Sequence, residues 1–576
     1  MKKLLFILTC LAAASAAVPA DACTNVIISK GASANGSVMV SYAADSHMLF
    51  GELYFKKAAR WKKGAMLSVD EWDTGRHLTE IPQPAETYKT IGNMNEHQLI
   101  IGETTYGGRE ELMQEDGLID YGSLIYITLQ RARTAREAIA TIVELADTYG
   151  YCSEGESFSI ADREEAWVMD LIGRGDTGKG IVYVAMRVPD GAICAHANQS
   201  RIGRFPLDDT DNCLYAEDVI SLARSKGWFD GKDEDFSFCD AYCPADFGTV
   251  RGCDARAWSA FNILTGGKFR YKGDDGEMHV CDSYDFIDYA TGADLSHPFP
   301  LFVYPEEKIT VKQVADVMRD HYEGTPMDMT QDIGAGGNAL PYRWRPMEWK
   351  VDGATYVNER AIATQQTGFW FVAEARGWLP EEIGGIFWFG TDDAATSYLT
   401  PIYTATCEVP ECFREGNGSI LQYSPTASFW INNRVSNACY KAYNIMAPTV
   451  VEARDAFEND QIFRATRQVD STAVAMLSHS LWHRRAVRRI NRYLTRYTVE
   501  TAQRQFESWK KLEELLLVKY MDGNVKDQNP DGSFITSETS DRMPANIGWP
   551  GYTELWKRSV AASDKGAFLK VPAPEE

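Results

Sequence analysis

The sequence lacks several patterns that would place it in other functional classes. Beyond the first two dozen residues, no segment reaches the ~18–20 uncharged residues that a membrane-spanning helix needs. Positive charge is in deficit, since 58 lysines and arginines face 81 aspartates and glutamates, giving a formal net charge of −23. This balance disfavours nucleic acid and anionic membranes as partners. We therefore expect no membrane insertion and no nucleic-acid partner, and the sequence leaves a homo-oligomer open.

Metal-binding signatures are also scarce. The sequence contains no HExxH motif, and the pairs Cys239–Cys243 and Cys407–Cys412 lack the second CxxC or histidine pair of a structural zinc site. The stretch 527–538 matches the spacing of an EF-hand calcium loop, but Pro530 interrupts it and no helix pattern follows. This context favours a plain acidic surface loop. We expect catalysis without a metal or a cofactor.

What the sequence does contain begins with a leader. Two lysines precede an apolar stretch that ends near Val18, and Ala20-Asp21-Ala22 supplies a small-x-small cleavage pattern. Cleavage there would remove residues 1–22 as a signal peptide and make Cys23 the first residue. We therefore expect a periplasmic or secreted protein. A lipid-modified Cys23 is the alternative, although the residues before it lack the branched aliphatic side chain of most lipoprotein sites.

An N-terminal cysteine carries a nucleophile and a base on one residue. Its α-amine has a reference pKa of about 7.7–8.0 and can take the thiol proton at neutral pH. This pattern predicts the nucleophile of an N-terminal nucleophile hydrolase at Cys23. An ordinary disulfide cysteine is the structural alternative. A dyad with His47, His97 or His196 is another, which the α-amine makes unnecessary.

The remaining cysteines favour disulfides. Of the 12 cysteines, ten lie beyond Cys23, an even number in a chain expected to be exported. The pairs 239–243 and 407–412 are each spaced to close a tight loop. Buried free thiols are the alternative.

Hydrophobic patterning predicts an α+β chain. Alternation of apolar and polar residues indicates strands over 24–29, 37–41, 98–103, 158–161, 166–171, 181–188 and 193–197. Between the third and fourth of these, Thr134 and Glu137 form a capping-box pattern before an apolar helical face, and Gly150 stands at the C-cap position. Groups of strands thus alternate with helices, as in layered α+β proteins.

Several short blocks of the sequence, taken in their order along the chain, carry a resemblance to a known family. They are Cys-Thr-Asn-Val-Ile-Ile at 23–28, Asp-Ser-His at 45–47, Asn-Glu-His-Gln-Leu at 95–99, Ala-Asn-Gln-Ser-Arg-Ile at 197–202, Ala-Arg-Ala-Trp at 255–258 and Gly-Ile-Phe-Trp-Phe-Gly at 385–390. With these blocks the chain resembles the cysteine-type dipeptidase family of the N-terminal nucleophile (Ntn) hydrolases. The resemblance covers nearly all of the chain after the leader.

The resemblance implies a four-layer αββα sandwich in which Cys23 begins a central strand and its thiol attacks the amide carbonyl. Asp45 would hold the α-amine, Asn198 would stabilise the oxyanion and Arg256 would lie near the thiol. Related enzymes often carry an arginine shortly before the aspartate, where this chain has Tyr42-Ala43-Ala44, so Arg256 is expected to carry more of the thiolate stabilisation.

Two further residues are candidates for substrate binding. Thr104 and Thr105 end a predicted strand, where they are expected to contact the substrate or to add a backbone donor. Strand-end threonines are also commonly structural.

The last third of the chain has a different pattern, in which helices are predicted and strands are not. The region 450–520 reads as helix-rich, and the basic run 483–489 is typical of a solvated helix face. No Pro/Gly/Ser-rich linker precedes it. We expect an Ntn-hydrolase domain over 23–450 and a helix-rich extension over 451–576 that packs on the same domain.

Three functions remain open from the sequence. The leading hypothesis is an exported cysteine dipeptidase that hydrolyses short peptides through an acyl-enzyme on Cys23. The second is an N-acyl amide hydrolase of the penicillin and bile-salt acylase type. The third is a lipid-anchored binding protein without catalysis.

Overall fold

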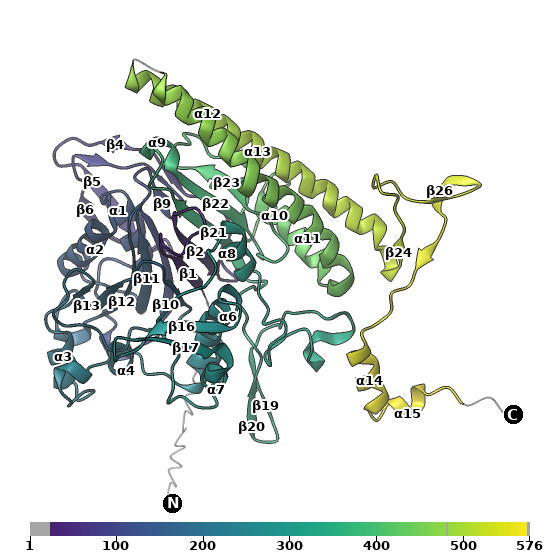
Figure 1. The fold of residues 1–576 in the computed structure, drawn as a ribbon, viewed down its shortest axis with the longest axis horizontal. Helices are drawn as coiled ribbons and strands as arrows, with labels where there is room; N and C mark the ends of the chain where they lie inside the picture. The colour runs from purple at the N-terminus through teal and green to yellow at the C-terminus, as the bar shows by residue number, and fades with distance from the viewer. Residues whose placement is uncertain (1–22, 480–481, 573–576) are drawn as a thin grey trace, which may run out of the picture.

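The computed structural model describes residues 23–479 and 482–572, so the predicted leader lies outside the described residues. Two large sheets make up the body of the protein (Figure 1). The first has the order β18-β14-β1-β2-β21-β22-β23, with bounds Phe302–Val303, Ile193–His196, Thr24–Ile28, Val38–Asp45, Thr367–Ala375, Gly385–Thr391 and Thr400–Tyr403. All neighbouring strands in it are antiparallel.

The second sheet is also antiparallel and has eight strands in the order β15-β13-β12-β11-β10-β9-β8-β3. Their bounds are Cys213–Tyr215, Ile181–Arg187, Ala166–Gly173, Gly155–Ala161, Ile100–Tyr106, Met94–Asn95, Thr90–Ile91 and Phe55–Lys56. Strands β1 and β2 of the first sheet contact β10 and β11 of the second. The two sheets therefore face one another.

Alternation along the strands divides the core into three clusters of buried residues. Ile27 on β1 packs between the sheets with Ile100, whereas its neighbours Val26 and Ile28 pack on the opposite side of the first sheet against α6 (Ala255–Leu264) and α8 (Val311–Val317). A third cluster joins the outer side of the second sheet to α1 (Tyr121–Leu129) and α2 (Ala135–Tyr149). The structure is thus α+β, as the sequence predicts.

Helix α2 shows how local sequence sets a boundary. The hydroxyl of Thr134 accepts a hydrogen bond from the backbone N–H of Glu137 at 3.2 Å, as predicted. The Glu137 carboxylate accepts from the N–H of Arg133 at 2.8 Å, one residue earlier than a capping box requires. Gly150 follows the helix with a φ of 78°, which a glycine adopts at low cost.

The C-terminal region is helical, as the sequence predicts. Helices α10 (Ser428–Cys439), α11 (Tyr443–Asp460), α12 (Thr466–Ser478) and α13 (His483–Lys519) cross the upper part of the molecule in Figure 1. Helix α13 packs along the edge strand β23. Residue 450 lies inside α11, so the helix continues across the expected start of the extension.

The expected disulfides are wrong for the described residues, because all eleven cysteines there are free thiols. Cys239 and Cys243 lie at the two ends of one helical turn around α4 (Phe238–Tyr242). Side chains at i and i+4 on a helix are about 5–6 Å apart at Cβ, beyond the ~3.5–4.5 Å of a disulfide. Cys412 is buried while Cys407 is exposed.

The stretch 527–538 does not continue into a helix. It leads into the hairpin of β25 (Thr536–Ser537) and β26 (Ser540–Pro544), and the carboxylate of Asp531 accepts hydrogen bonds from Ser533. Within residues 23–479 and 482–572, no group of three or more His, Cys, Asp and Glu side chains is placed to hold a metal ion.

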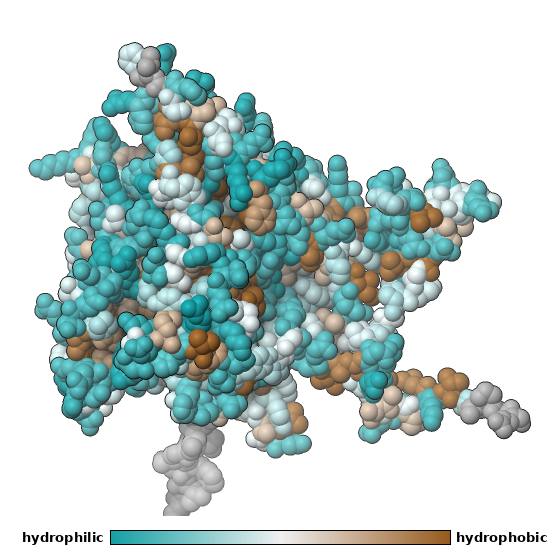
Figure 2. Space-filling view, in the orientation of Figure 1, coloured by the Kyte–Doolittle hydropathy of each residue, from teal (hydrophilic) through white to brown (hydrophobic). Residues whose placement is uncertain are grey.

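The surface is mostly hydrophilic on the face drawn in Figure 2, with hydrophobic residues gathered along the C-terminal segment. The exposed aromatic residues there include Trp549, Tyr552 and Phe568. Across the part of the chain that the structure describes, no helix has both the length and the hydropathy for crossing a bilayer.

Candidate active site

The predicted site residues meet at one edge of the first sheet. Cys23 comes directly before β1, Asp45 ends β2, and Asn198 follows β14 by two residues. Because β1 is antiparallel to both β2 and β14, its first residue lies beside the last residues of its two neighbours. The topology therefore brings together three residues that are distant in sequence.

The Cys23 thiol lies among acidic and phenolic groups. Its Sγ is 3.6 Å from the hydroxyl of Tyr42 and 3.7 Å from Oε1 of Glu103. Burial raises the pKa of the Cys23 thiol well above its usual range, and the carboxylates of Glu103 and Asp45 raise it further. The backbone N–H of Asp45 hydrogen-bonds the sulfur and opposes that rise. The thiol is therefore protonated at neutral pH, and a base has to accept its proton during reaction.

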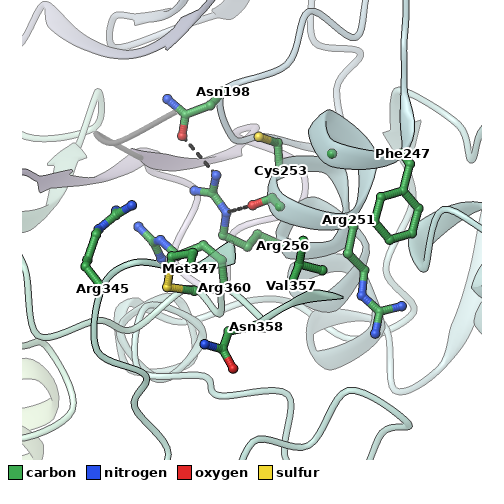
Figure 3. Close-up of a pocket in the computed structure, with 12 residues that line it drawn as sticks. Asn198, Phe247, Arg251, Cys253, Arg256, Arg345, Met347, Val357, Asn358 and Arg360 are labelled. Carbon is green, nitrogen blue, oxygen red and sulfur yellow. Dashed lines mark hydrogen bonds between the residues drawn. The ribbon is translucent and has the colours of Figure 1, made fainter. Parts of the chain in front are cut away.

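Arg256 connects Cys23 to Asn198. Its Nη1 donates to the carbonyl of Cys23 at 2.6 Å and to the hydroxyl of Thr24 at 2.8 Å. Its Nη2 donates to Oδ1 of Asn198 at 2.9 Å, the contact drawn as a dashed line in Figure 3. The side chain is fully buried at the start of α6, and burial lowers the pKa of the Arg256 guanidinium. Arg256 thus contacts the backbone of Cys23, and its role in stabilising the thiolate stays a prediction.

Asn198 is held in an unusual backbone conformation. Its φ is 54°, in the left-handed region that asparagine tolerates better than most residues. Its Nδ2 donates to the carbonyl of Thr105 at 2.6 Å. An amide nitrogen carries two N–H groups, so one remains as a donor after this bond.

A buried carboxylate holds the loop after Asn198. Oδ2 of Asp170 on β12 accepts from the Ser200 hydroxyl at 2.7 Å and from the backbone N–H groups of Arg201 and Ile202, both at 3.1 Å. Its Oδ1 accepts from Ser157 at 2.6 Å. Sequence reasoning did not select Asp170, since it stands inside a strand with no motif around it.

Asp45 contacts an arginine that the sequence analysis did not select. Its Oδ2 accepts from Nη2 of Arg360 at 2.7 Å, and its Oδ1 accepts from the Thr367 hydroxyl at 2.7 Å. Burial raises the pKa of the Asp45 carboxyl, while Arg360 and Thr367 oppose the rise. Arg360 supplies, from 315 residues away, a cation beside Asp45. The absence of an arginine at 42–44 was the available signal that another residue fills this place.

The two threonines have separate surroundings. The Thr104 hydroxyl is fully buried and hydrogen-bonds Nδ1 of His196 at 2.8 Å, while Nε2 of that ring contacts the Ser159 hydroxyl at 2.7 Å. Burial lowers the pKa of His196 to about 3, so the ring is neutral. Thr105 is half-buried, and its hydroxyl donates to Oε1 of Glu156 at 2.7 Å.

His97, another member of the alternative dyad, is paired elsewhere. Its Nδ1 lies 2.5 Å from Oε1 of Glu381.

A pair of buried glutamates extends the network around the thiol. Glu103 on β10 and Glu156 on β11 are 2 % and 0 % exposed, and their carboxyl groups hydrogen-bond one another. Tyr42 donates its hydroxyl to Glu103. Burial raises the pKa of both carboxyls, and the mutual repulsion raises that of Glu156 further. The predicted strand 158–161 begins three residues late, since the polar Gly-Glu-Ser at 155–157 does not have a strand-like pattern, and Glu156 was missed with it.

An arginine-rich hollow adjoins Asn198 and Arg256 (Figure 3). It is open to solvent, its enclosed volume is about 20 Å³, and Arg251, Arg345 and Arg360 also line it. Arg251 is paired with Glu359. The hollow lies beside the candidate oxyanion donor and carries positive charge.

A thiol, an asparagine and an arginine gathered in one site on an α+β scaffold fit a cysteine peptidase. The chain belongs to Peptidase family C69, whose model matches residues 58–456. This stretch contains Thr104, Thr105, Asn198 and Arg256, and it begins after Cys23 and Asp45.

Similar curated proteins are named dipeptidases. The chain is 22% identical over 452 residues to "Probable dipeptidase B" of Lactococcus lactis, covering 76% of this chain and 84% of that protein. It is 23% identical over 401 residues to "Probable dipeptidase" of Salmonella dublin, covering 66% and 81%. It is 24% identical over 451 residues to "Probable dipeptidase A" of Streptococcus pyogenes serotype M3, covering 73% and 84%.

Proposed function

We propose that the protein is an exported cysteine dipeptidase whose nucleophile is the N-terminal thiol of Cys23. The observation that carries the proposal is the position of this thiol at the start of β1, beside Asp45 and linked through Arg256 to Asn198. The cleavage pattern before Cys23 supports both the export and the free α-amine. The names of the similar proteins support dipeptides as substrates.

The proposed reaction has two acyl-transfer steps. The α-amine of Cys23 takes the thiol proton while Sγ attacks the carbonyl carbon, and the free N–H of Asn198 donates to the oxyanion. The C–N bond then breaks, and the leaving amine receives the proton from the α-ammonium. Water attacks the resulting thioester, gives one proton to the α-amine, and releases the acid and the thiol. No metal takes part.

We also propose that the two facing sheets and their outer helices are the four-layer αββα sandwich of the Ntn hydrolases. The three buried clusters support this, since they correspond to one interface between the sheets and one between each sheet and its helices. The arginine-rich hollow supports binding of a short peptide through its terminal carboxylate, since guanidinium groups pair readily with carboxylates.

The proposal is tested first at the mature N-terminus and at the thiol. Intact-mass analysis is expected to find an unmodified Cys23 as the first residue, and Cys23→Ala is expected to abolish dipeptide hydrolysis while the melting temperature stays near that of wild type. Iodoacetamide is expected to inactivate the enzyme and chelators are not. A diacylglycerol mass on Cys23, or full activity in Cys23→Ala, would overturn the proposal.

A further inference from the structure

We propose that Glu103, with Glu156 as its proton-sharing partner, binds the α-ammonium group of the substrate's first residue and so selects peptides with a free amino terminus directly before the scissile bond. The inference rests on the proposed function and deepens it. It separates a dipeptidase from an N-acyl amide hydrolase, whose substrates carry no charge at this position.

Distance favours this assignment. When Sγ attacks the carbonyl of a first residue, the ammonium nitrogen is two bonds from the attacked carbon, through bonds of about 1.5 Å each. The nitrogen then lies roughly 3–4 Å from the sulfur. Oε1 of Glu103 is itself 3.7 Å from Sγ. A nitrogen on the Glu103 side of the sulfur is then within hydrogen-bond reach of this carboxylate.

The charge of the pair also fits a cation. Two adjacent buried carboxyls do not both ionise, so they share one proton and carry one negative charge. Among the described residues, no arginine, lysine or histidine forms an ion pair with either glutamate. Both Oε2 atoms are buried and accept no hydrogen bond from a third residue in the described part of the chain. Oε1 of Glu103 accepts from the Tyr42 hydroxyl and, at 3.7 Å, from the Cys23 thiol, and Oε1 of Glu156 accepts from the Thr105 hydroxyl. Accepting capacity thus remains on a fixed, buried anion.

The negative charge of the glutamate pair disfavours the thiolate form of Cys23 when no substrate is bound. Glu103 raises the pKa of Cys23, which opposes formation of the thiolate that attacks the substrate. A bound ammonium group neutralises the pair and removes this repulsion. The substrate that fits the site therefore also assists the nucleophile, whereas an uncharged acyl group leaves the repulsion in place.

The test compares alanyl dipeptides with lactoyl analogues, in which a hydroxyl replaces the ammonium group, on processed enzyme that begins at Cys23. Wild type is expected to prefer the alanyl substrate by at least ~10²-fold in kcat/KM. Glu103→Gln is expected to lose ~10²-fold on the alanyl substrate and to change less than about threefold on the lactoyl one. Glu154→Gln is the control, since it removes an exposed carboxylate two residues before Glu156 and is expected to leave the ratio unchanged.

Alkylation of Cys23 by iodoacetamide separates binding from damage to the thiol. In Glu103→Gln it is expected to be as fast as in wild type or faster, because a carboxylate that raises the thiol pKa is gone. Equal losses on both substrates would overturn the proposal. They would show that Glu103 acts on the thiol or the α-amine of Cys23 and not on the substrate. Slow alkylation in the variant would overturn it as well.

A binding measurement keeps the inference distinct from the proposed reaction. Alaninamide is expected to protect Cys23 of wild type from alkylation at concentrations where lactamide does not, and Glu103→Gln is expected to abolish this difference. Protection with no dipeptide turnover would refute the proposed function and support the ammonium site. Turnover with equal protection by both amides would refute the ammonium site alone.

Discussion

Asp45 and Arg360 form a buried ion pair next to Cys23, the proposed nucleophile, with 1 % and 6 % of their surfaces exposed. Removing one partner of such a pair leaves an uncompensated charge, which costs more than the pair itself contributes. Replacing either residue alone is therefore expected to destabilise the protein.

Replacing Arg360 by methionine is expected to destabilise the protein by about 3–5 kcal/mol at neutral pH. Without the guanidinium, burial raises the pKa of Asp45 further above its unfolded value. The folded state then binds a proton more readily than the unfolded state, so the loss becomes smaller as the pH falls. Urea unfolding at pH 8 and pH 5 measures this.

Asp45→Asn/Arg360→Met serves as the control, since it has no unpaired carboxylate and is expected to be more stable than Arg360→Met. A loss that is independent of pH would contradict the assignment of the cost to Asp45.

His196 carries a second pH dependence of the opposite sign. Its folded pKa of about 3 lies below the ordinary histidine pKa of 6.5, so between these values the unfolded state binds more protons and stability falls as the pH falls. Between pH 7.5 and 4.5 this group is expected to cost wild type about 2–3 kcal/mol.

His196→Gln keeps a donor and an acceptor for Thr104 and Ser159 but does not titrate. The stability difference between wild type and this variant is expected to shrink over the same pH range, measured by urea unfolding. Parallel pH profiles would contradict a neutral buried His196.

At the scale of elements, strand β12 positions the loop that carries Asn198. Asp170→Ala removes the acceptor of four hydrogen bonds and leaves buried donors unpaired, at about 1–3 kcal/mol for each donor that finds no water. We expect a lower melting temperature and at least a tenfold loss in kcat/KM, because the loop after Asn198 is no longer held.

Ser157→Ala is the matched control. It removes the one bond to Asp170 that does not come from this loop, so stability is expected to fall by about 1 kcal/mol while kcat/KM stays near wild type. An equal loss of activity in both variants would argue against a positioning role for the loop.

Some of the strands and helices could be predicted from the sequence, but several residues of the site could not. Strands β1 and β2 and helix α2 follow from alternation and capping residues within short windows. Glu156 and Asp170 could not be selected, because each is polar inside a strand whose burial depends on distant pairing partners. Arg360 gave no local signal at all. Cys23, Asp45, Asn198 and Arg256 were named from motifs, and the structure brings them to one edge of a sheet.

At the scale of the whole molecule, the C-terminal region divides into a packed helix and an exposed segment. Helix α13 buries Ile490, Leu494, Trp509 and Leu516 against the body of the protein. The residues after Tyr520 are mostly exposed, and one backbone bond of 3.0 Å joins Thr553 to Gly337.

Removing residues 521–576 is therefore expected to leave kcat/KM within about twofold and to lower the melting temperature only slightly. A chain that ends at residue 479 is expected not to fold, since each of the large apolar side chains of α13 contributes roughly 1.5–3 kcal/mol of burial, and their sum approaches the whole stability of a protein. Calorimetry and activity assays measure both. An active, folded chain without α13 would contradict this view of the helix.

The convergence of strand ends on Cys23 has a consequence for the order of events in folding. Arg256 lies 233 residues from Cys23, and Arg360 and Thr367 lie 315 and 322 residues from Asp45. Contacts of such high sequence separation form slowly, after long loops have closed. Cys23, the proposed nucleophile, is the earliest part of the site along the chain, yet residues far later in the sequence complete its surroundings. A partly folded chain thus has a cysteine but no catalyst, so hydrolysis reports completion of the entire fold.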